Sequence, residues 1–467
     1  MEVKIGLETH VQLNTQSKIF CGCRNPVNLD SEPDPNTIVC DVCLGLPGSK
    51  PVFNEKVLEM ALKMALAFGS KVAQETFFSR KTYFYPDMSK NFQITQYEVP
   101  VASGGSAELA GRSIRLRRIH MEEDPARLVH VGGLGGRYVL VDYNRAGIPL
   151  VEIVTEPDFQ SPAEARMYLQ KLVTILEYLG VYDSASRAVV KSDANISLEG
   201  GARIEVKNIT GTKEVEQALK YELLRQKNLL KRGMVVKRAT RMWNPDLGVT
   251  EAMRSKEEEE EYGYIFDADL PMINVNKSNL KRLESNLPEL PDKRMERFVK
   301  RYKLPAKVAE SIVSDVDLAG LFEQVSKKTE PRLAGTWIAG YLKKTLNWNG
   351  LKFRNSGIKP EWITELLSMF KCGKITDRNA ELAIRKMVED RKPLMIVVKR
   401  YKLGKLEDST KIKGIIRSVL EKNRLAVKDY KKGEEKALHF LVGEVMREAK
   451  GQVDAQEVRD IIVKLIR

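Results

Sequence analysis

Acidic and imidazole side chains come together in two short motifs of this 467-residue chain. Glu8 and His10 lie two residues apart where apolar and polar residues alternate, and Glu122 and Glu123 follow His120. Residues i and i+2 of a strand share a face, so Glu8 and His10 project together. Paired carboxylates repel unless a cation neutralises them, and oxygen ligands with a nearby imidazole suit Mg²⁺ or Mn²⁺. For either motif alone, solvated acids beside a satisfied histidine are the simpler interpretation.

A polar sheet surface is also predicted for residues 191–198 and 203–209, which alternate as a β-hairpin. Pairing Asn195 with Glu205 keeps the polar side chains of both strands on one face and leaves a three-residue loop. Asp193 then lies opposite a lysine two positions past Glu205. This face could hold further metal or phosphate ligands, although a solvated antiparallel face would show the same pattern.

Four of the five cysteines form two close pairs, Cys21-x-Cys23 and Cys40-x-x-Cys43, separated by 16 residues. In a reducing compartment this spacing is typical of a tetrahedral Zn²⁺ site, with four free thiols as the alternative. Because protein ligands would fill all four positions, we expect the zinc to be structural. The remaining thiol, Cys372, is predicted to be buried and inert.

An aromatic segment, residues 77–97, contains seven of the 33 aromatic residues, with Arg80, Lys81 and Lys90 between them. It could be a platform for a base or nucleotide, or a Tyr/Phe-rich strand of the core. Neither a GxxxxGK[ST] loop nor a GxGxxG fingerprint is present. The glycine stretch 132–136 has neither spacing and is predicted to be a hairpin tip.

The elements that must position these groups mix strands and helices over the first 291 residues. Ser161, Pro162 and Glu164 predict a capped helix start with a capping box. Strands grouped together, without regular alternation with helices, favour an α+β fold built on antiparallel sheet. The strands are predicted over 3–13, 137–143, 149–154, 191–198 and 203–209, and the helices over 54–69, 161–180 and 212–232.

The last third of the chain differs in charge and pattern. Residues 292–467 hold 40 Lys and Arg against 24 Asp and Glu, whereas residues 1–291 hold 37 against 39. A basic unit attached to a neutral one suggests a bound polyanion, with a solvated helical surface as the alternative. We predict a linker at 286–291, all-α domains over 292–405 and 406–467, and tail helices over 409–422, 434–450 and 454–466. The acidic run 257–261 is predicted to be a solvated turn or helix face.

The composition is that of an ordinary globular protein, with 43% hydrophobic and 30% charged residues. These values exclude a fibrous or largely disordered chain. No apolar run approaches the length of a membrane span, and MEVKIGLETH contains no signal-peptide core. Together with the few cysteines, this predicts a soluble, cytoplasmic protein.

Taken together, several long runs resemble one family, the B subunits of glutamine-dependent aspartyl/glutamyl-tRNA amidotransferases. The resemblance is in order and covers nearly the whole chain. The runs are IGLETHVQLNTQSKIFCGC, VCDVCLGLPG, RKTYFYPDMSKNFQITQY, HMEEDPARL, VDYNRAGIPLVEIVTEPD, SDANISL, ELPDKRMERFV and GEEKALHFLVGEVMREAKGQ.

This resemblance implies a cradle-shaped catalytic domain, 1–291, akin to glutamine synthetase, followed by two helical domains that bind tRNA. It implies that ATP phosphorylates the side-chain carboxylate of Asp-tRNA(Asn) or Glu-tRNA(Gln), and that ammonia then displaces the phosphate. An amidase A subunit would supply ammonia from glutamine through a tunnel, and a small C subunit would complete a heterotrimer. Which misacylated tRNA is preferred stays open.

The resemblance also implies roles for residues inside the matching runs. It implies that Mg²⁺ is bound and ATP is positioned by Glu8, His10, Glu122 and Glu123. A second cation would be held, or ammonia oriented, by Asp193 and Glu205. The nucleotide or the aminoacyl end would be contacted by Lys81 and Tyr85. The stretch 261–269 lacks the Arg and Pro residues of the family's DYRYFPEPD-like run, so no contact is carried over from it.

Two alternative functions remain at this point. The related E-type subunit of a glutaminyl-specific enzyme carries a large extra domain, for which this chain has no room. A non-catalytic tRNA-binding scaffold would explain the basic last third, but it leaves the Glu8, His10, Glu122 and Glu123 set without a role.

Overall fold

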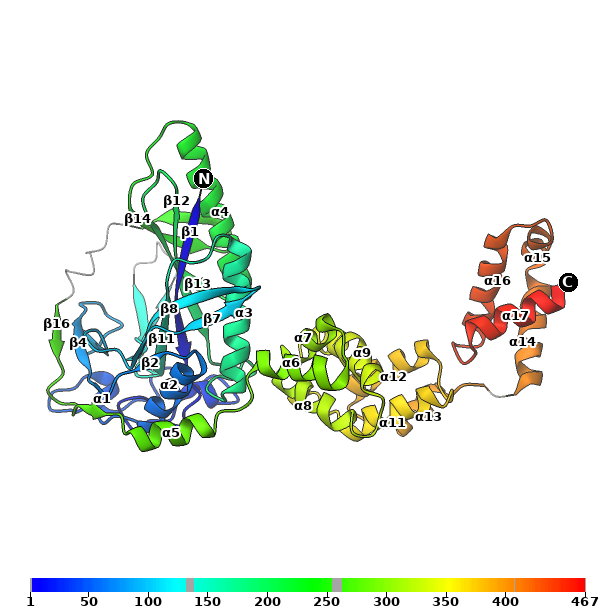
Figure 1. Ribbon diagram of the computed structural model, residues 1–467, viewed down its shortest axis with the longest axis horizontal. Helices are drawn as coiled ribbons and strands as arrows, with labels where there is room; N and C mark the ends of the chain where they lie inside the picture. The colour runs from blue at the N-terminus through cyan, green and yellow to red at the C-terminus, as the bar shows by residue number, and fades with distance from the viewer. Residues whose placement is uncertain (1, 132–137, 254–262, 407, 467) are drawn as a thin grey trace. The chain divides into compact units, whose positions relative to one another are not determined.

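Two compact units make up the chain, Met1–Leu290 and Pro291–Arg467 (Figure 1). The computed structural model describes residues 2–131, 138–253, 263–406 and 408–466. The glycine stretch 132–136 and the acidic run 257–261 therefore lie outside the described residues. The first unit mixes sheet and helix and the second is helical, which confirms the predicted fold class at this level. The likeness to glutamine synthetase stays a prediction.

A ten-stranded sheet forms the centre of the first unit. Its strands are β1 (Val3–Gln12), β2 (Lys71–Val72), β6 (Ala102–Ser103), β7 (Ser106–Leu109), β8 (Arg112–Glu123), β11 (Pro149–Thr155), β12 (Val190–Leu198), β13 (Ile204–Thr210), β14 (Ala239–Asn244) and β15 (Val249–Ala252). The order is β15-β14-β13-β12-β1-β11-β8-β6-β2, with β7 paired to β8. Neighbouring strands are antiparallel except β13 and β14.

The two faces of this sheet have opposite character because the sequence alternates. Ile5, Leu7 and Val11 of β1 are fully buried in the core. Helices α3 (Pro162–Tyr178) and α4 (Thr212–Lys231) pack against β1, β12 and β13. Glu8 and His10 alternate with the apolar residues and so belong to the polar face.

Helix α3 begins as predicted. The Ser161 side chain accepts a hydrogen bond from the backbone N–H of Glu164, and Pro162 is the first helical residue. The Glu164 carboxylate accepts from the backbone N–H of Gln160, one residue before the position that a standard capping box uses. The polar groups at this helix end are thereby satisfied.

The hairpin register is confirmed, because Asn195 pairs with Glu205. A bulge interrupts the ladder between Ser192 and Ala194, yet Asp193 Oδ2 still lies 3.3 Å from Lys207 Nζ. The ladder closes at the pair Ile196 and Ile204, so the connection is longer than the predicted three residues.

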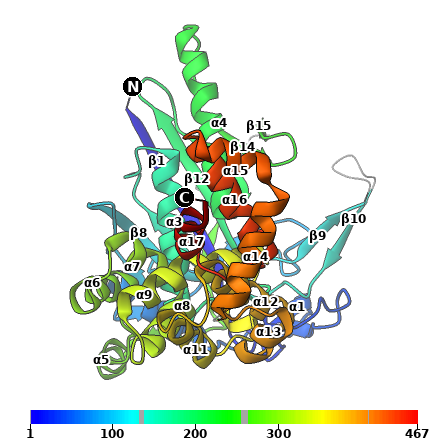
Figure 2. The ribbon, with the colours of Figure 1, turned by 90° about the vertical axis from the view of Figure 1, so that its right-hand side faces the viewer.

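Smaller elements surround the sheet. Figure 2 shows β9 (Arg127–His130) and β10 (Val139–Asp142) as a ribbon that projects from the first unit. The aromatic segment supplies β4 (Ser79–Thr82) and β5 (Phe92–Thr95), which join β16 (Tyr264–Phe266) in a three-stranded sheet. Strands β3 (Glu75–Thr76) and β17 (Ile273–Asn274) form a two-stranded sheet, and the short helices are α1 (Asp41–Leu44), α2 (Glu55–Ala67) and α5 (Lys277–Ser285).

The second unit consists of helices around two hydrophobic clusters. One cluster runs from Phe298 to Leu403 and the other from Ile412 to Ile466. The helices are α6 (Pro291–Tyr302), α7 (Ala306–Val313), α8 (Val316–Val325), α9 (Pro331–Thr336), a π-helical turn (Trp337–Leu342), α10 (Lys343–Trp348), α11 (Pro360–Lys371), α12 (Asp377–Asp390), α13 (Leu394–Tyr401), α14 (Ser409–Lys422), α15 (Arg424–Lys431), α16 (Glu435–Glu448) and α17 (Ala455–Ile466).

Two sequence predictions need correction here. Helix α15 lies between the predicted tail helices, because its Lys-rich sequence suits a helix as well as a connection. Cys372 is exposed, not buried, because it follows the last residue of α11. No helix among the described residues is long and apolar enough to cross a bilayer.

Candidate active site and metal centres

Three neighbouring strands bring two histidines and two glutamates together on the polar face. His10 of β1 lies opposite Glu152 of β11, which in turn lies opposite His120 of β8. Glu122 follows His120 by two residues and therefore shares its face. Glu122, Glu152 and His120 are buried, and the His10 side chain is 27% exposed. The cluster is thus open to solvent only beside His10.

The distances within this cluster fit a divalent cation. His10 Nε2 lies 3.4 Å from Glu122 Oε1 and 3.5 Å from Glu152 Oε2. Ligand atoms of an octahedral Mg²⁺ ion, with bonds of about 2.1 Å, lie about 3.0 to 4.2 Å apart. Thr95 donates a hydrogen bond of 3.1 Å to Glu122 Oε2, which orients that carboxylate. His10, Glu122 and Glu152 are therefore suitable metal ligands.

Without a bound metal ion, protonation of the two histidines balances the negative charge of the two glutamates. Burial alone would lower the pKa of His10, but Glu152 and then Glu122 raise it to about 10. Burial likewise opposes protonation of His120, whose pKa the same two carboxylates raise to about 9. Burial would raise the pKa of Glu152, yet the two imidazolium charges hold it well below its usual value.

Metal binding at this cluster should release protons, because a metal-bound imidazole must be neutral. At pH 8, below the pKa of His10, we expect about one proton released for each Mn²⁺ ion bound. Calorimetric titrations in two buffers with different ionisation enthalpies measure this number. His10→Asn should abolish the release, and Mn²⁺ binding to the unaltered chain without proton release would contradict the assignment.

A second row of charged groups continues the polar face toward β13. Glu8 lies opposite Asp193 on the neighbouring strand, and Asn195 donates a hydrogen bond of 3.0 Å to Glu8 Oε1. Burial, then the charges of Glu152, Asp193 and Glu205, raise the pKa of Glu8 to about 7. This carboxyl group is therefore well suited to exchange a proton near neutral pH.

One lysine neutralises part of this second row. Lys207 Nζ lies 2.6 Å from Glu205 Oε1 and 3.3 Å from Asp193 Oδ2. A cation, the lysine ammonium, thus already occupies the space between the two carboxylates. This arrangement disfavours a second metal ion between Asp193 and Glu205.

Glu123 does not join the cluster that the sequence led us to expect. Consecutive residues of a strand point to opposite faces, so Glu123 points away from Glu122. Its carboxylate forms an ion pair with Lys90 at 2.6 Å and accepts the backbone N–H of Ile94 at 2.8 Å. Glu123 thus connects β8 to the aromatic segment.

Lys81 and Tyr85 lie near the cluster but not in it. Lys81 is on β4 and pairs with Gln93 of β5. Strand β5 separates β4 from β8 and carries Thr95, the residue that contacts Glu122. Tyr85 follows β4 and is half exposed. We call the small sheet of β16, β4 and β5 the wall beside the acidic site, which consists of His10, His120, Glu122 and Glu152. Lys81 lies in this wall, and Tyr85 follows its strand β4 by three residues.

The stretch 261–269, from which no contact was carried over, lies partly in the same wall. Residues 263–269 are described, and the side chain of Asp267 is fully buried. Both Asp267 oxygens accept hydrogen bonds of 3.1 Å from Arg80. This bidentate pair fixes β16 against β4.

A cation that sequence reasoning missed also faces the site. Lys191 of β12 lies opposite His10 in the sheet register. Among the residues that the structure describes, Lys191 forms no ion pair, whereas Lys207 and Lys90 do. Burial lowers the pKa of Lys191. The polar face therefore offers one ammonium group to an anionic ligand.

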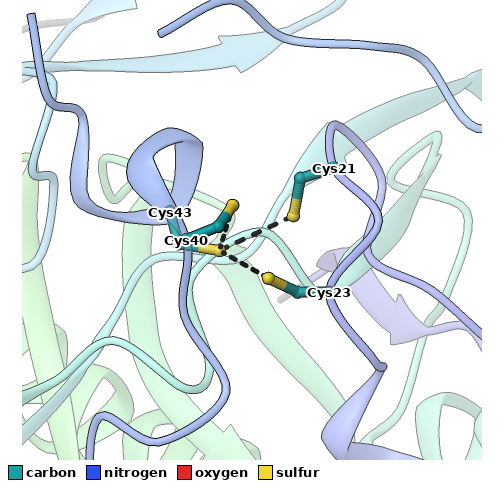
Figure 3. Close-up of side chains that lie close together, drawn as sticks. All are labelled: Cys21, Cys23, Cys40 and Cys43. Atoms are coloured by element: carbon teal, nitrogen blue, oxygen red, sulfur yellow. Dashed lines mark hydrogen bonds between the residues drawn. The ribbon is translucent and has the colours of Figure 1, made fainter.

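The four paired cysteines converge into one cluster, with Cys21 and Cys23 from the loop after β1 and Cys40 and Cys43 from the start of α1 (Figure 3). Cys43 Sγ lies 3.6 Å from that of Cys21, 3.8 Å from that of Cys40 and 3.9 Å from that of Cys23. Tetrahedral zinc with Zn–S bonds of about 2.3 Å requires sulfur atoms about 3.8 Å apart. The cluster therefore fits Zn²⁺, and each ligand position is supplied by the chain.

A buried lysine supports this thiol cluster. Lys18 has no exposed surface, and its Nζ lies 3.2 Å from Cys43 Sγ and 2.9 Å from the carbonyl oxygen of Ile38. The hydrogen bond from Cys21 and the charge of Lys18 lower the pKa of Cys43 to about 4. A thiolate, the form that binds zinc, is thus favoured at this position.

Glu152 and His120 are the residues of the acidic site that the sequence did not single out. His120 belongs to the second acidic motif, but the motif alone assigns it no role. Glu152 interrupts the apolar run of β11, in which each residue is buried. A carboxylate in a buried strand is rare unless it has a partner. The single Glu152 within this apolar run is therefore the signal by which the sequence could have identified the residue.

Comparison with known proteins finds relatives over the whole length of the chain. Residues 3–281 match the family described as the GatB/GatE catalytic domain, and residues 320–466 match the GatB domain. The B subunit of the aspartyl/glutamyl-tRNA(Asn/Gln) amidotransferase from Methanoregula boonei is 44% identical over 485 residues, covering 100% of this chain and 98% of the relative. The proteins of the same name from Methanosarcina barkeri and Natronomonas pharaonis are each 42% identical, covering 100% and 98% of this chain.

The matches over residues 3–281 and 320–466 show that the chain is a member of the GatB/GatE family. The chain belongs, over its full length, with the B subunits of amidotransferases. The resemblance found in the sequence is confirmed.

Proposed function

We propose that this chain is the ATP-dependent amidating subunit of a tRNA-dependent amidotransferase that acts on Asp-tRNA(Asn), Glu-tRNA(Gln) or both. The observation that carries the proposal is the convergence of His10, Glu122 and Glu152 beside Glu8. Activation of a carboxylate by phosphoryl transfer needs cations that offset phosphate charge, and this cluster is built to hold one.

Each group of the polar face then has a task. His10, Glu122 and Glu152 would hold Mg²⁺, which supplies charge neutralisation to the phosphates of ATP. Lys191 offers its ammonium group to the transferred phosphoryl group. The substrate carboxylate oxygen attacks the γ-phosphorus, and ADP leaves, which yields an acyl phosphate.

Amide formation follows on the same face. The nitrogen of ammonia attacks the acyl carbon, and inorganic phosphate leaves with the bonding electron pair. Asp193 and Glu205, positioned by Lys207, would orient the ammonia. Glu8, whose pKa is about 7, would accept the proton that nitrogen loses. Lys81 and Tyr85, in the neighbouring wall, would contact the nucleotide or the aminoacyl end.

Partners follow from this chemistry. The B-subunit names of the relatives imply further subunits. We propose an amidase A subunit that releases ammonia from glutamine, and a small C subunit, in a cytoplasmic heterotrimer. The zinc cluster would serve as scaffold, because its four thiols leave no position for substrate.

The direct test is to incubate the reconstituted complex with each misacylated tRNA, ATP and glutamine. We expect Asn-tRNA or Gln-tRNA, with ADP formed only when misacylated tRNA is present, and we expect Lys191→Met to raise the KM for ATP. Transfer of the amide group without ATP, or unchanged turnover in a His10→Ala variant, would favour the scaffold alternative.

Removal of the tail should weaken tRNA binding. Residues 408–467 hold many of the lysines and arginines of the basic unit, and each phosphate contact contributes about −0.7 to −0.9 to the slope of log K against log salt. We expect the truncated chain to bind tRNA less tightly and with a shallower slope in filter binding at several salt concentrations. Equal affinity and slope would reject this assignment.

A further inference from the structure

An arginine on the polar face of the sheet has no part in the chemistry described so far. Arg118 of β8 precedes His120 and Glu122 by two and four residues. The intervening Ile119 and Met121 are buried in the core on the other face. Because alternate residues of a strand share a face, Arg118 points to the same side of the sheet as Glu122. Its guanidinium group therefore projects from the face that carries the acidic site.

The positive charge of Arg118 is not neutralised within the described part of the chain. Its Nε is buried without a hydrogen-bond partner, and the described residues form no ion pair with it. By contrast, Arg115 pairs with Asp158 at 2.7 Å, and Arg117 pairs with Glu156 at 3.0 Å. Buried polar groups are satisfied in most proteins, and an unsatisfied one often has a catalytic role or binds a ligand. Arg118 is therefore available to an anion.

The strand positions on either side of Arg118 carry no acidic residue. The sheet register places Arg118 opposite the exposed Ser103 of β6 and opposite Val154 of β11. Val154 lies two residues from Glu152 and shares its face, and it lies opposite Glu8 of β1. Glu8, Val154 and Arg118 thus form one row across three strands. The row has a carboxyl group at one end, an apolar residue in the middle and a guanidinium group at the other end.

The length of this row fits a substrate carboxyl group with ammonia beside it. Neighbouring strands are about 4.8 Å apart, so Glu8 and Arg118 project from positions about 10 Å apart. Arg118 hydrogen-bonded to a carboxyl oxygen, ammonia about 3–3.5 Å from the carboxyl carbon, and a hydrogen bond from ammonia to Glu8 together span about 10 Å. The row can thus hold a carboxyl carbon between its bound oxygen and the incoming nitrogen.

The candidate metal ligands lie on the next row of the same face. His10 and Glu152 are two residues from Glu8 and Val154 along their strands, a separation of about 7 Å. Lys191 lies on the far side of His10 from Arg118, because β12 and β8 are on opposite sides of β1 and β11. The two cations therefore serve different positions, Lys191 beside the phosphates and Arg118 beside the row that ends at Glu8.

We infer that Arg118 binds the side-chain carboxylate of the aspartyl or glutamyl group on the misacylated tRNA, and so selects an acidic side chain over an amide. The inference rests on the proposed function, which makes this carboxylate the substrate. The planar fork of arginine matches a carboxylate through two parallel hydrogen bonds. An amide has only one oxygen, and its NH₂ group is a donor that would face the donors of Arg118. The same contact therefore disfavours the amidated product.

A comparison of two forms of one tRNA tests this inference, because they differ only in the side chain. Competition filter binding with the reconstituted complex and a non-hydrolysable ATP analogue compares Asp-tRNA(Asn) with Asn-tRNA(Asn), and Glu-tRNA(Gln) with Gln-tRNA(Gln). We expect an affinity preference of at least about 10-fold for the acidic member of at least one pair. Arg118→Met should reduce this preference to about 1-fold, and Arg118→Lys, which keeps the charge but not the fork, to about 3-fold.

A matched substitution on the neighbouring residue is the control. Arg117 pairs with Glu156 and lies outside the row, so Arg117→Met should keep the full preference. Guanidinium chloride, at a concentration too low to unfold the protein, should restore part of the preference to Arg118→Met, which a merely structural role would not allow. Should the melting temperature show that Arg118→Met does not fold, Arg118→Lys decides the test. An unchanged preference in the folded variant, or no preference in the unaltered complex, would overturn the inference.

The outcomes separate this inference from the proposed function. Normal amide formation together with a preference that does not depend on Arg118 rejects the inference alone. A preference that depends on Arg118, in a complex that forms no amide, rejects the proposed function alone. A raised KM for ATP in Arg118→Met with an unchanged preference would identify phosphate as the ligand of Arg118 and would also reject the inference.

Discussion

Replacing Glu152 by glutamine is expected to lower the amidation rate of the reconstituted enzyme by about 100-fold or more. The substitution keeps the size of the side chain but removes one carboxylate from the cluster with His10 and Glu122. Single groups that hold or orient a charge-stabilising centre are worth about 10²–10³ in rate. Single-turnover assays with misacylated tRNA and ATP measure the effect, and tRNA affinity should stay unchanged.

A matched substitution four residues away provides the control. Glu156 lies just beyond β11, pairs with Arg117 at 3.0 Å and takes no part in the cluster. Glu156→Gln should retain nearly full activity. Because Glu152→Gln leaves His10 and His120 with less negative charge beside them, its melting temperature and Mn²⁺ affinity must be measured as well. A folded variant with normal activity would remove Glu152 from the mechanism.

Loss of the thiol cluster should have the largest effect on stability. The double change Cys21→Ser and Cys43→Ser removes two of four ligands and should lower the zinc content of the purified protein from about one ion per chain to none. Structural zinc sites stabilise small folds by about 10–16 kcal/mol. We therefore expect a melting temperature at least about 10 °C lower, by calorimetry.

Two further variants test whether zinc content and stability depend on the thiol cluster itself. Cys372→Ser should keep both zinc and stability, because Cys372 lies outside the cluster. Lys18→Met should keep the ligands but release zinc to a chelator faster, because the buried ammonium contacts Cys43 Sγ. Full zinc content in the double serine variant would show that the metal, if any, binds elsewhere.

Much of the sheet could be predicted because alternation is a local signal. The shared face of Glu8 and His10 and the pairing of Asn195 with Glu205 both follow from a period of two. The same rule also argued against placing Glu123 beside Glu122, since neighbours in a strand point to opposite faces. The resemblance to the family nevertheless led to the prediction that Glu123 joins the metal site. The structure instead follows the alternation rule, because Glu123 lies on the opposite face from Glu122.

The composition of the acidic site could not be predicted, because it depends on which strands are neighbours in the sheet. Glu152 lies 142 residues after His10 along the chain, and only the order β1-β11-β8 brings it between His10 and His120. Nothing local to the sequence fixes that order. Helix α15 was missed for a different reason, because a Lys-rich segment is compatible with both helix and loop. The exposure of Cys372 was missed because an unpaired cysteine is usually buried, whereas this one follows the end of α11.

Anomalous scattering from Mn²⁺, in crystals of the complex grown with a non-hydrolysable ATP analogue, tests the central claim most directly. We predict a peak about 2.0–2.2 Å from His10 Nε2 and from one oxygen each of Glu122 and Glu152, with the analogue's phosphates beside it. A well-occupied nucleotide whose metal ion lies away from these three side chains would contradict the account.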